Sequence, residues 1–149
     1  MAAMPVRYEM VVDCADPARL TRFWTEALGY VPAPPPEGYP TWAAYLHSVG
    51  MPEEDLDEFG GIADPDGVGP RIWFQVVPEG KAVKNRLHFD IRASGGLTVP
   101  FETRKERIEA EADRLVAAGA TRVGNLYQEG IELYAVNMLD PEGNEFDIN

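Results

Sequence analysis

The sequence predicts an α+β fold built from two similar halves. Several segments alternate apolar and polar residues, which indicates strands that bury one face. Two other segments repeat apolar residues every three or four positions and end at a glycine, which indicates helices that pack by one face. The predicted order is β-α-β-β-(β) and then β-α-β-β-β. Each half also holds a turn of nearly the same sequence, Asp64-Pro65-Asp66-Gly67 and Asp140-Pro141-Glu142-Gly143.

The first half opens with a strand at residues 8–12, in which alternate residues form one apolar face. A helix begins at Pro17, because Asp16 suits the N-cap and proline suits the first turn, and it ends before Gly29. Five prolines between residues 32 and 40 exclude regular structure there. We expect a strand at 41–48, an acidic loop at 51–69 and a strand at 71–77.

The second half opens with a strand at residues 86–92. Its apolar face holds Leu87, Phe89 and Ile91, and its polar face includes His88 and Asp90. A helix at 102–118 follows, and its periodic residues predict a buried face of Ile108, Ala112, Leu115 and Val116. Three strands complete this half, near residues 120–127, 131–138 and 144–148, with a turn at 140–143 between the last two.

Composition restricts the class of protein. The chain has 149 residues, is 45% hydrophobic and carries a net charge of −12, which is typical of one globular domain. So acidic a chain is a poor partner for nucleic acid or for an anionic membrane surface. A single cysteine, Cys14, excludes an internal disulfide. We therefore expect a cytoplasmic protein.

Three segments, in this order, carry a resemblance to a known family. They are residues 12–30, which run from Val12-Asp13-Cys14 through Phe23-Trp24 to Leu28-Gly29-Tyr30, residues 83–90, and residues 140–146. The chain thereby resembles the glyoxalase-like domain of the vicinal oxygen chelate superfamily (glyoxalase, bleomycin resistance, extradiol dioxygenase). The resemblance implies one domain, 1–149, of two βαβββ modules, about 5–78 and 84–149. It also implies a cup of curved sheets with helices on the outer face.

The resemblance further implies a divalent metal in that cup, held by Glu9, His88 and Asp147. Glutamate is usual at the last of these positions and histidine or glutamine at the first, so the chain departs from the pattern at both. Glu145 lies two residues from Asp147 on the same strand face and is the alternative last ligand. Imidazole and carboxylate suit Mn²⁺, Fe²⁺, Ni²⁺ or Zn²⁺, which would act as a Lewis acid. Glu145 or Glu9 is the expected general base.

Other interpretations stay open at this point. Charged residues on a polar strand face also form exposed ion pairs that have no catalytic role. Trp42, Trp73 and Gln75 are expected to line the cup and contact an organic ligand, or else to pack in the interior. The chain is thus a metal-dependent lyase, isomerase or dioxygenase, or a metal-free drug-binding protein of the bleomycin-resistance kind. A third reading is a module that acts by pairing, since the resemblance implies homodimers whose modules pair within or between chains.

Overall fold

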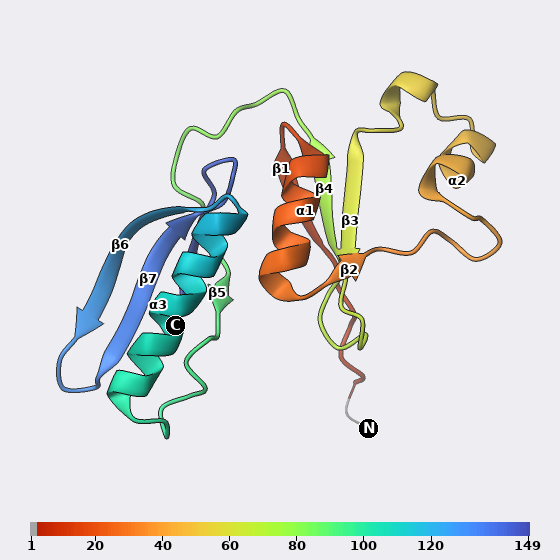
Figure 1. The fold of residues 1–149 in the computed structure, drawn as a ribbon. Coiled ribbons are helices and arrows are strands. Elements are labelled where there is room, and N and C mark those ends of the chain that lie inside the picture. Colours follow the sequence, from red (N-terminus) through yellow and green to blue (C-terminus); the bar gives the residue numbers. More distant parts are fainter. Residues whose placement is uncertain (1–2) are drawn as a thin grey trace. The chain divides into compact units, whose positions relative to one another are not determined.

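The structure is a computed structural model that describes residues 3–149, so the first two residues of the predicted domain lie outside it. The chain divides into two compact units, one ending at Gly80 and one running from Lys81 to Asn149. Each unit holds a four-stranded mixed sheet and a helix that packs on one face of that sheet (Figure 1). We describe the two units separately.

The sheet of the first unit has the strand order β1-β4-β3-β2, in which β1 and β4 are parallel and the other pairs antiparallel. The helix α1 packs on β3 and β4. A short helix and a 3-10 turn at Glu53–Asp55 separate β2 from β3. In chain order the elements are β1 (Met10–Cys14), α1 (Pro17–Leu28), β2 (Val31–Pro32), α2 (Trp42–Ser48), β3 (Phe59–Ala63) and β4 (Ile72–Val76).

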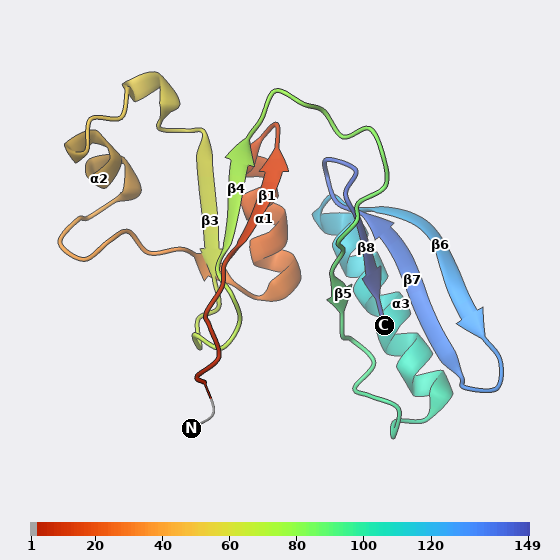
Figure 2. The ribbon, with the colours of Figure 1, turned by 180° about the vertical axis from the view of Figure 1, so that it is seen from behind.

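The second unit repeats this topology. Its sheet has the order β5-β8-β7-β6. The strands β5 and β8 are parallel, the other pairs are antiparallel, and α3 packs on β7 and β8. Seen from behind, each sheet shows a face that its long helix leaves uncovered (Figure 2). The predicted α+β fold of two βαβββ halves is confirmed. The elements are β5 (Asp90–Ile91), α3 (Phe101–Ala118), β6 (Thr121–Gln128), β7 (Leu133–Leu139) and β8 (Glu145–Ile148).

The first helix forms where its capping residues predict it. The Asp16 carboxylate accepts a hydrogen bond from the Arg19 N–H at 3.0 Å, and Pro17 occupies the first turn. Gly29 ends the helix in the left-handed region, with φ of 66°. The periodic residues Leu20 and Phe23 are buried against the sheet, as predicted.

The helix α3 also forms as predicted, and Ile108, Ala112 and Leu115 are fully buried. The prediction for Val116 was wrong, because this side chain is 45% exposed. Val116 follows Leu115 directly, and a one-residue step turns a helix by about 100°, away from the buried stripe.

Three predictions for the first half were wrong, and the smallest concerns Pro32, which forms the two-residue strand β2 with Val31. Residues 42–48 form a helix and not a strand, since the Thr41 hydroxyl caps the Ala44 N–H at 3.1 Å. Within the predicted loop, Phe59–Ala63 is the strand β3. Its glycines concealed it: a side chain on Gly60 would collide with Thr21 of α1, and one on Gly61 with the Trp73 ring. The backbone thus passes close under the helix where only glycine fits.

The strand expected at 86–92 is much shorter. Only Asp90 and Ile91 form β5, although the Phe89 carbonyl already accepts the Asp147 N–H at 2.9 Å. Leu87 is 81% exposed and does not belong to a buried face. The chain before it bends because the Glu145 carboxylate binds the Asn85 N–H at 2.9 Å, which removes that group from any ladder.

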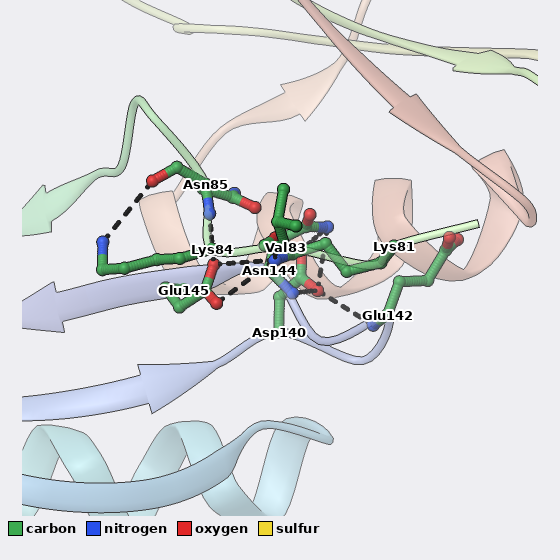
Figure 3. Close-up of polar contacts among 8 residues, drawn as sticks. All are labelled: Lys81, Val83, Lys84, Asn85, Asp140, Glu142, Asn144 and Glu145. Carbon is green, nitrogen blue, oxygen red and sulfur yellow. Dashed lines mark hydrogen bonds and ion pairs between the residues drawn. The ribbon is translucent and has the colours of Figure 1, made fainter. Parts of the chain in front are cut away.

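The two similar turns allow an internal comparison. Asp140 is only 3% exposed, and its Oδ1 accepts the N–H groups of Glu142 and Asn144 at 2.8 and 3.0 Å (Figure 3). The half-buried Asp64 carboxylate accepts the corresponding N–H groups of Asp66 and Val68 in exposed hydrogen bonds of 2.9 and 3.1 Å, and also that of Gly69. Asp140 thus closes its turn through a buried carboxylate and part-buried hydrogen bonds, whereas Asp64 is half-buried and two of its bonds are exposed.

We predict that Asp140→Ala lowers the free energy of unfolding by about 2 kcal/mol, because buried N–H groups lose a charged acceptor. Asp64→Ala, at the corresponding turn, should cost less, since water replaces the carboxylate there. Chemical denaturation of both variants measures the difference. Equal losses would show that burial does not distinguish the two turns.

A second polar contact ties α3 to the sheet. The Arg122 guanidinium binds the Glu109 carboxylate through two hydrogen bonds of 2.6 and 2.8 Å, and the buried Tyr134 hydroxyl donates to the same carboxylate. These contacts lower the pKa of Glu109 from 4.5 to about 2. Folded protein therefore binds fewer protons at this site than unfolded protein between those two pH values.

The contribution of Glu109 to stability should thus be complete above about pH 4.5 and disappear as the pH falls toward 2. We expect Glu109→Gln to lower stability at neutral pH and to flatten the loss of stability in acid. Glu106→Gln, on the exposed side of the same helix, is the matched control. Denaturation midpoints between pH 7 and pH 2 provide the measurement. An acid profile unchanged by Glu109→Gln would contradict this assignment.

Candidate metal centre

Three side chains of the second unit converge on one point. His88 precedes β5, Asp90 lies in β5, and Asp147 lies in β8. His88 Nε2 is 3.3 Å from Asp90 Oδ1 and 3.6 Å from Asp147 Oδ2. Among the described residues, this is the one group of three histidine, cysteine, aspartate or glutamate side chains whose possible metal-ligand atoms all lie within 4.8 Å of one another.

Strand register creates this convergence. Asp90 and Asp147 are direct partners in the parallel β5–β8 pair, so their side chains leave the sheet on the same face. The neighbours of Asp147 in β8, Phe146 and Ile148, are 1% and 0% exposed and face α3. The group therefore lies on the face of the sheet that α3 does not cover.

Asn137 fixes one of the two carboxylates. It is the partner of Asp147 in the antiparallel β7–β8 pair, and its Nδ2 donates to Asp147 Oδ1 at 2.8 Å. This bond leaves Asp147 Oδ2 as the oxygen nearer to His88. Asp90, Asp147 and Asn137 thus form a polar row across three strands, of the kind that orients metal ligands.

The geometry fits a divalent cation. Two ligand atoms at about 2.1 Å from one ion, at tetrahedral or octahedral angles, are about 3.0–3.4 Å apart. The two distances from His88 Nε2 lie at or just above this range. One imidazole and two carboxylates suit the metals predicted above. Without an ion, the same atoms form ion pairs when His88 is protonated.

Glu145 lies on the same face of β8 but has other partners. Its carboxylate accepts the Asn85 N–H at 2.9 Å and pairs with Lys81 Nζ at 3.1 Å (Figure 3). These contacts, the Asn85 bond foremost, lower the pKa of Glu145 from 4.5 to about 2. A carboxylate so stabilised as an anion is a weak base. The contacts of Glu145 hold the segment before His88 against β8. Its role as general base stays a prediction, and the lowered pKa argues against that role.

The remaining predicted residues lie together in the first unit. Glu9, just before β1, accepts a hydrogen bond from Trp73 Nε1 at 2.8 Å. The Trp73 ring packs edge to face on Trp42, with ring centres 5.3 Å apart, and Trp42 Nε1 donates to the Ala33 carbonyl at 2.7 Å. Gln75 follows on the same face of β4 as Trp73, opposite the buried Phe74. Their roles as metal ligand and substrate contacts stay predictions.

Sequence reasoning had assigned no metal-binding or positioning role to Asp90 and Asn137. Asp90 alternates with His88 on the polar face of the predicted strand, which was a usable signal. Asn137 is the one amide in the apolar run Leu133–Leu139, and this isolation was also a signal. Asp90 and Asn137 lie beside Asp147 because of the way the strands pair, and strand pairing cannot be predicted from a single sequence.

Two halves of one topology, with a histidine and carboxylates on an open sheet face, define the vicinal oxygen chelate class. Residues 9–149 match the glyoxalase-like domain family, and the chain belongs to that family. No curated protein sequence matches the chain significantly. Among the described residues, no helix combines the length and apolar character needed to cross a bilayer.

Solved structures share this fold at low sequence identity. A glyoxalase/bleomycin resistance protein/dioxygenase family enzyme from Burkholderia phytofirmans PsJN is 18% identical, with 95% of this chain and 94% of that chain covered and a TM-score of 0.59. A possible glyoxalase from Bacillus cereus is 14% identical, with 98% of each chain covered and a TM-score of 0.59.

A third similar structure contains a metal and an organic ligand. It is a mutant of the genomically encoded fosfomycin resistance protein FosX from Listeria monocytogenes, complexed with Mn(II) and 1S,2S-dihydroxypropylphosphonic acid. It is 10% identical, covers 99% of this chain and 90% of that chain, and has a TM-score of 0.59. At these identities the three structures show a common fold.

Proposed function

We propose that the protein is a divalent-metal-dependent enzyme that acts on a small oxygen-bearing molecule, as a lyase, isomerase or dioxygenase. The observation that supports this most strongly is the convergence of His88, Asp90 and Asp147 within 4.8 Å on an open sheet face. The Mn(II) in FosX shows that a protein of this fold binds such an ion.

Each residue of the centre has a distinct role in this proposal. His88 and Asp147 bind the metal, and Asn137 holds Asp147 in the required orientation through its 2.8 Å bond. The family resemblance implies Glu9 as the third ligand, which stays an expectation for the titration below, and the Glu9 carboxylate accepts a hydrogen bond from Trp73 Nε1 at 2.8 Å. When bound, the metal supplies Lewis-acid stabilisation of negative charge on substrate oxygens.

Proton transfer falls to Asp90 in this arrangement. It is the most exposed member of the group, with 52% of its side chain accessible, so a substrate has access to its carboxylate. Its Oδ1 lies 3.3 Å from His88 Nε2, so the carboxylate is next to the position that a metal bound by His88 would take. Glu145 is the alternative base, but its bonds to Lys81 and Asn85 would first have to break.

The substrate we propose has an organic part as well as oxygens. Trp42 and Trp73 form a pair of half-buried aromatic rings on the same side of the first sheet as Glu9, and such rings suit an organic group. The diol phosphonate in FosX is one example of a small oxygen-rich ligand for this fold. A homodimer in the cytoplasm stays part of the proposal.

We predict that chelator-treated protein binds one equivalent of Mn²⁺ and that His88→Ala weakens this binding by more than about 100-fold, since a direct ligand is lost. Asn137→Leu should weaken it by about 10- to 100-fold, because Asp147 loses its orienting bond. His47→Ala, in α2, is the matched control and should bind Mn²⁺ normally. Calorimetric titration measures these affinities.

The third ligand can be identified in the same titration. Glu9→Gln should reduce Mn²⁺ affinity while Asp90→Asn leaves it nearly unchanged, if Glu9 binds the metal and Asp90 transfers the proton. The opposite result would make Asp90 the ligand. Native protein that binds no divalent metal would refute the enzyme proposed here.

A metal-free ligand-binding protein is the second candidate, and the aromatic cluster favours it. Tyr45 packs edge to face on Trp42, with ring centres 5.9 Å apart, and Tyr39 packs on Tyr45 at 5.2 Å. Tyr39 is 37% exposed, so the cluster is accessible from solvent. Partly exposed aromatic groups of this kind bind flat organic molecules by stacking.

For this second candidate we predict that small aromatic compounds stabilise chelator-treated protein in thermal-shift assays. Trp73→Leu should abolish the shift, because it removes the ring next to Trp42. Phe101→Leu, at an aromatic contact in the second unit, is the control. Shifts that appear only after Mn²⁺ is added would favour the metal-dependent enzyme instead.

A further inference from the structure

A hollow of about 460 Å³ lies in the second unit, and its lining includes none of the three residues of the metal centre. It is lined by the loop that joins β5 to α3, by α3 itself and by the beginning of β7. Tyr134 and Ile108 contribute buried side chains from the side of the sheet that α3 covers. Its volume suits a small organic molecule.

The charged side chains that line this hollow are both arginines; Asn149 also lines it, and its main-chain oxygen accepts the N–H groups of Ala93 and Ser94 at 2.7 and 3.1 Å. Arg92 comes from the loop and Arg104 from α3, in a chain whose net charge is −12. Neither guanidinium forms an ion pair with a carboxylate of residues 3–149, the terminal carboxylate of Asn149 included. The nearby Glu109 carboxylate is already paired with Arg122. The side chains that line the hollow therefore carry two positive charges and no negative charge.

Arg104 is the more informative of the two. It is 6% exposed, and its hydrogen bonds go to neutral carbonyl oxygens, from Nε to Val99 and from Nη1 to Glu132, both at 2.9 Å. Glu132 is also the one non-glycine residue with positive φ, 51°, among those described. A guanidinium has five N–H donors, and a buried charge without a counter-ion is costly. An anion in the hollow would remove this cost.

Two glycines give the loop a backbone conformation that other residues rarely adopt. Gly95 and Gly96 have φ of 86° and 96°, which other residues adopt only with strain. A side chain on Gly95 would come within 2.5 Å of Arg107 Nη1, which donates to the Ser94 carbonyl at 3.1 Å. Arg92, by contrast, is exposed and has no hydrogen-bond or ion-pair partner among residues 3–149.

We propose that this hollow binds a small oxyanion, the carboxylate or phosphate group of an organic molecule. Arg104 contacts the anion from the buried end of the hollow and Arg92 from its exposed end. Guanidinium groups match both kinds of oxyanion by paired N–H donors. The site shares no residue with the metal centre and stands independently of the proposed enzymatic function.

The test uses the whole chain, treated with chelator so that no metal competes for the anion. Inorganic phosphate and acetate are titrated separately, and the backbone N–H signals of Ser94, Gly95 and Gly96 are followed by NMR. We expect a saturable shift of these signals, with a dissociation constant of about 1 mM or below for at least one anion. Saturation by phosphate alone indicates a phosphate-bearing ligand, and saturation by acetate alone indicates a carboxylate.

Variants separate this site from general charge effects. Arg92→Met should weaken binding about tenfold or more, since it removes a charged donor from an exposed position without disturbing the fold. Arg19→Met, on the exposed face of α1, removes the same charge and should leave binding unchanged. Arg104→Lys keeps the charge but loses the paired donors, so it should also weaken binding.

Three results would overturn the proposal. The first is no saturable shift with either anion. The second is an equal loss of affinity in Arg92→Met and Arg19→Met, which would show only a general attraction. The third is a shift that begins at His88 and Asp147 and leaves the loop signals in place.

Discussion

The alternation of side chains in β8 is the constraint on which the second unit depends. This strand pairs with β5 on one side and with β7 on the other, so it forms the middle of the sheet. Phe146 and Ile148 enter the core beneath α3, and Asp147 therefore has to leave on the other face. A one-residue shift of register would bury the carboxylate and expose both apolar side chains. Core packing and the position of the metal centre thus have one cause.

The two units share one topology but carry different side chains on the sheet face that their long helix leaves uncovered. In each, the first strand pairs in parallel with the last, and one helix covers one face. In the first unit the uncovered face carries Trp73 and Gln75 beside Glu9, whereas in the second it carries Asp90 and Asp147. The two units thus have similar backbones, and the polar residues on their strands determine what each unit is able to bind.

Much of the fold could be predicted from local patterns, because its signals are local. The cap at Asp16 and the glycine stop at Gly29 define α1 within the helix itself. The failures came where contacts distant in sequence decide the structure. The strand around Gly60 exists because α1 passes close above it, and the bend before Leu87 exists because Glu145 binds Asn85. The same holds for the candidate site, because strand pairing places Asp90 and Asn137 next to Asp147.

The two sides of the second sheet carry opposite electrostatic arrangements. On the open face of the sheet, two carboxylates meet at His88, and a cation would relieve their repulsion. On the face beneath α3, Arg104 is buried without an acidic partner, and an anion would relieve its isolation. The apolar layer of Phe146 and Ile148 lies between these two sides and limits direct neutralisation of one by the other. Binding of a cation on the open face and of an anion beneath α3 would therefore each be electrostatically favourable.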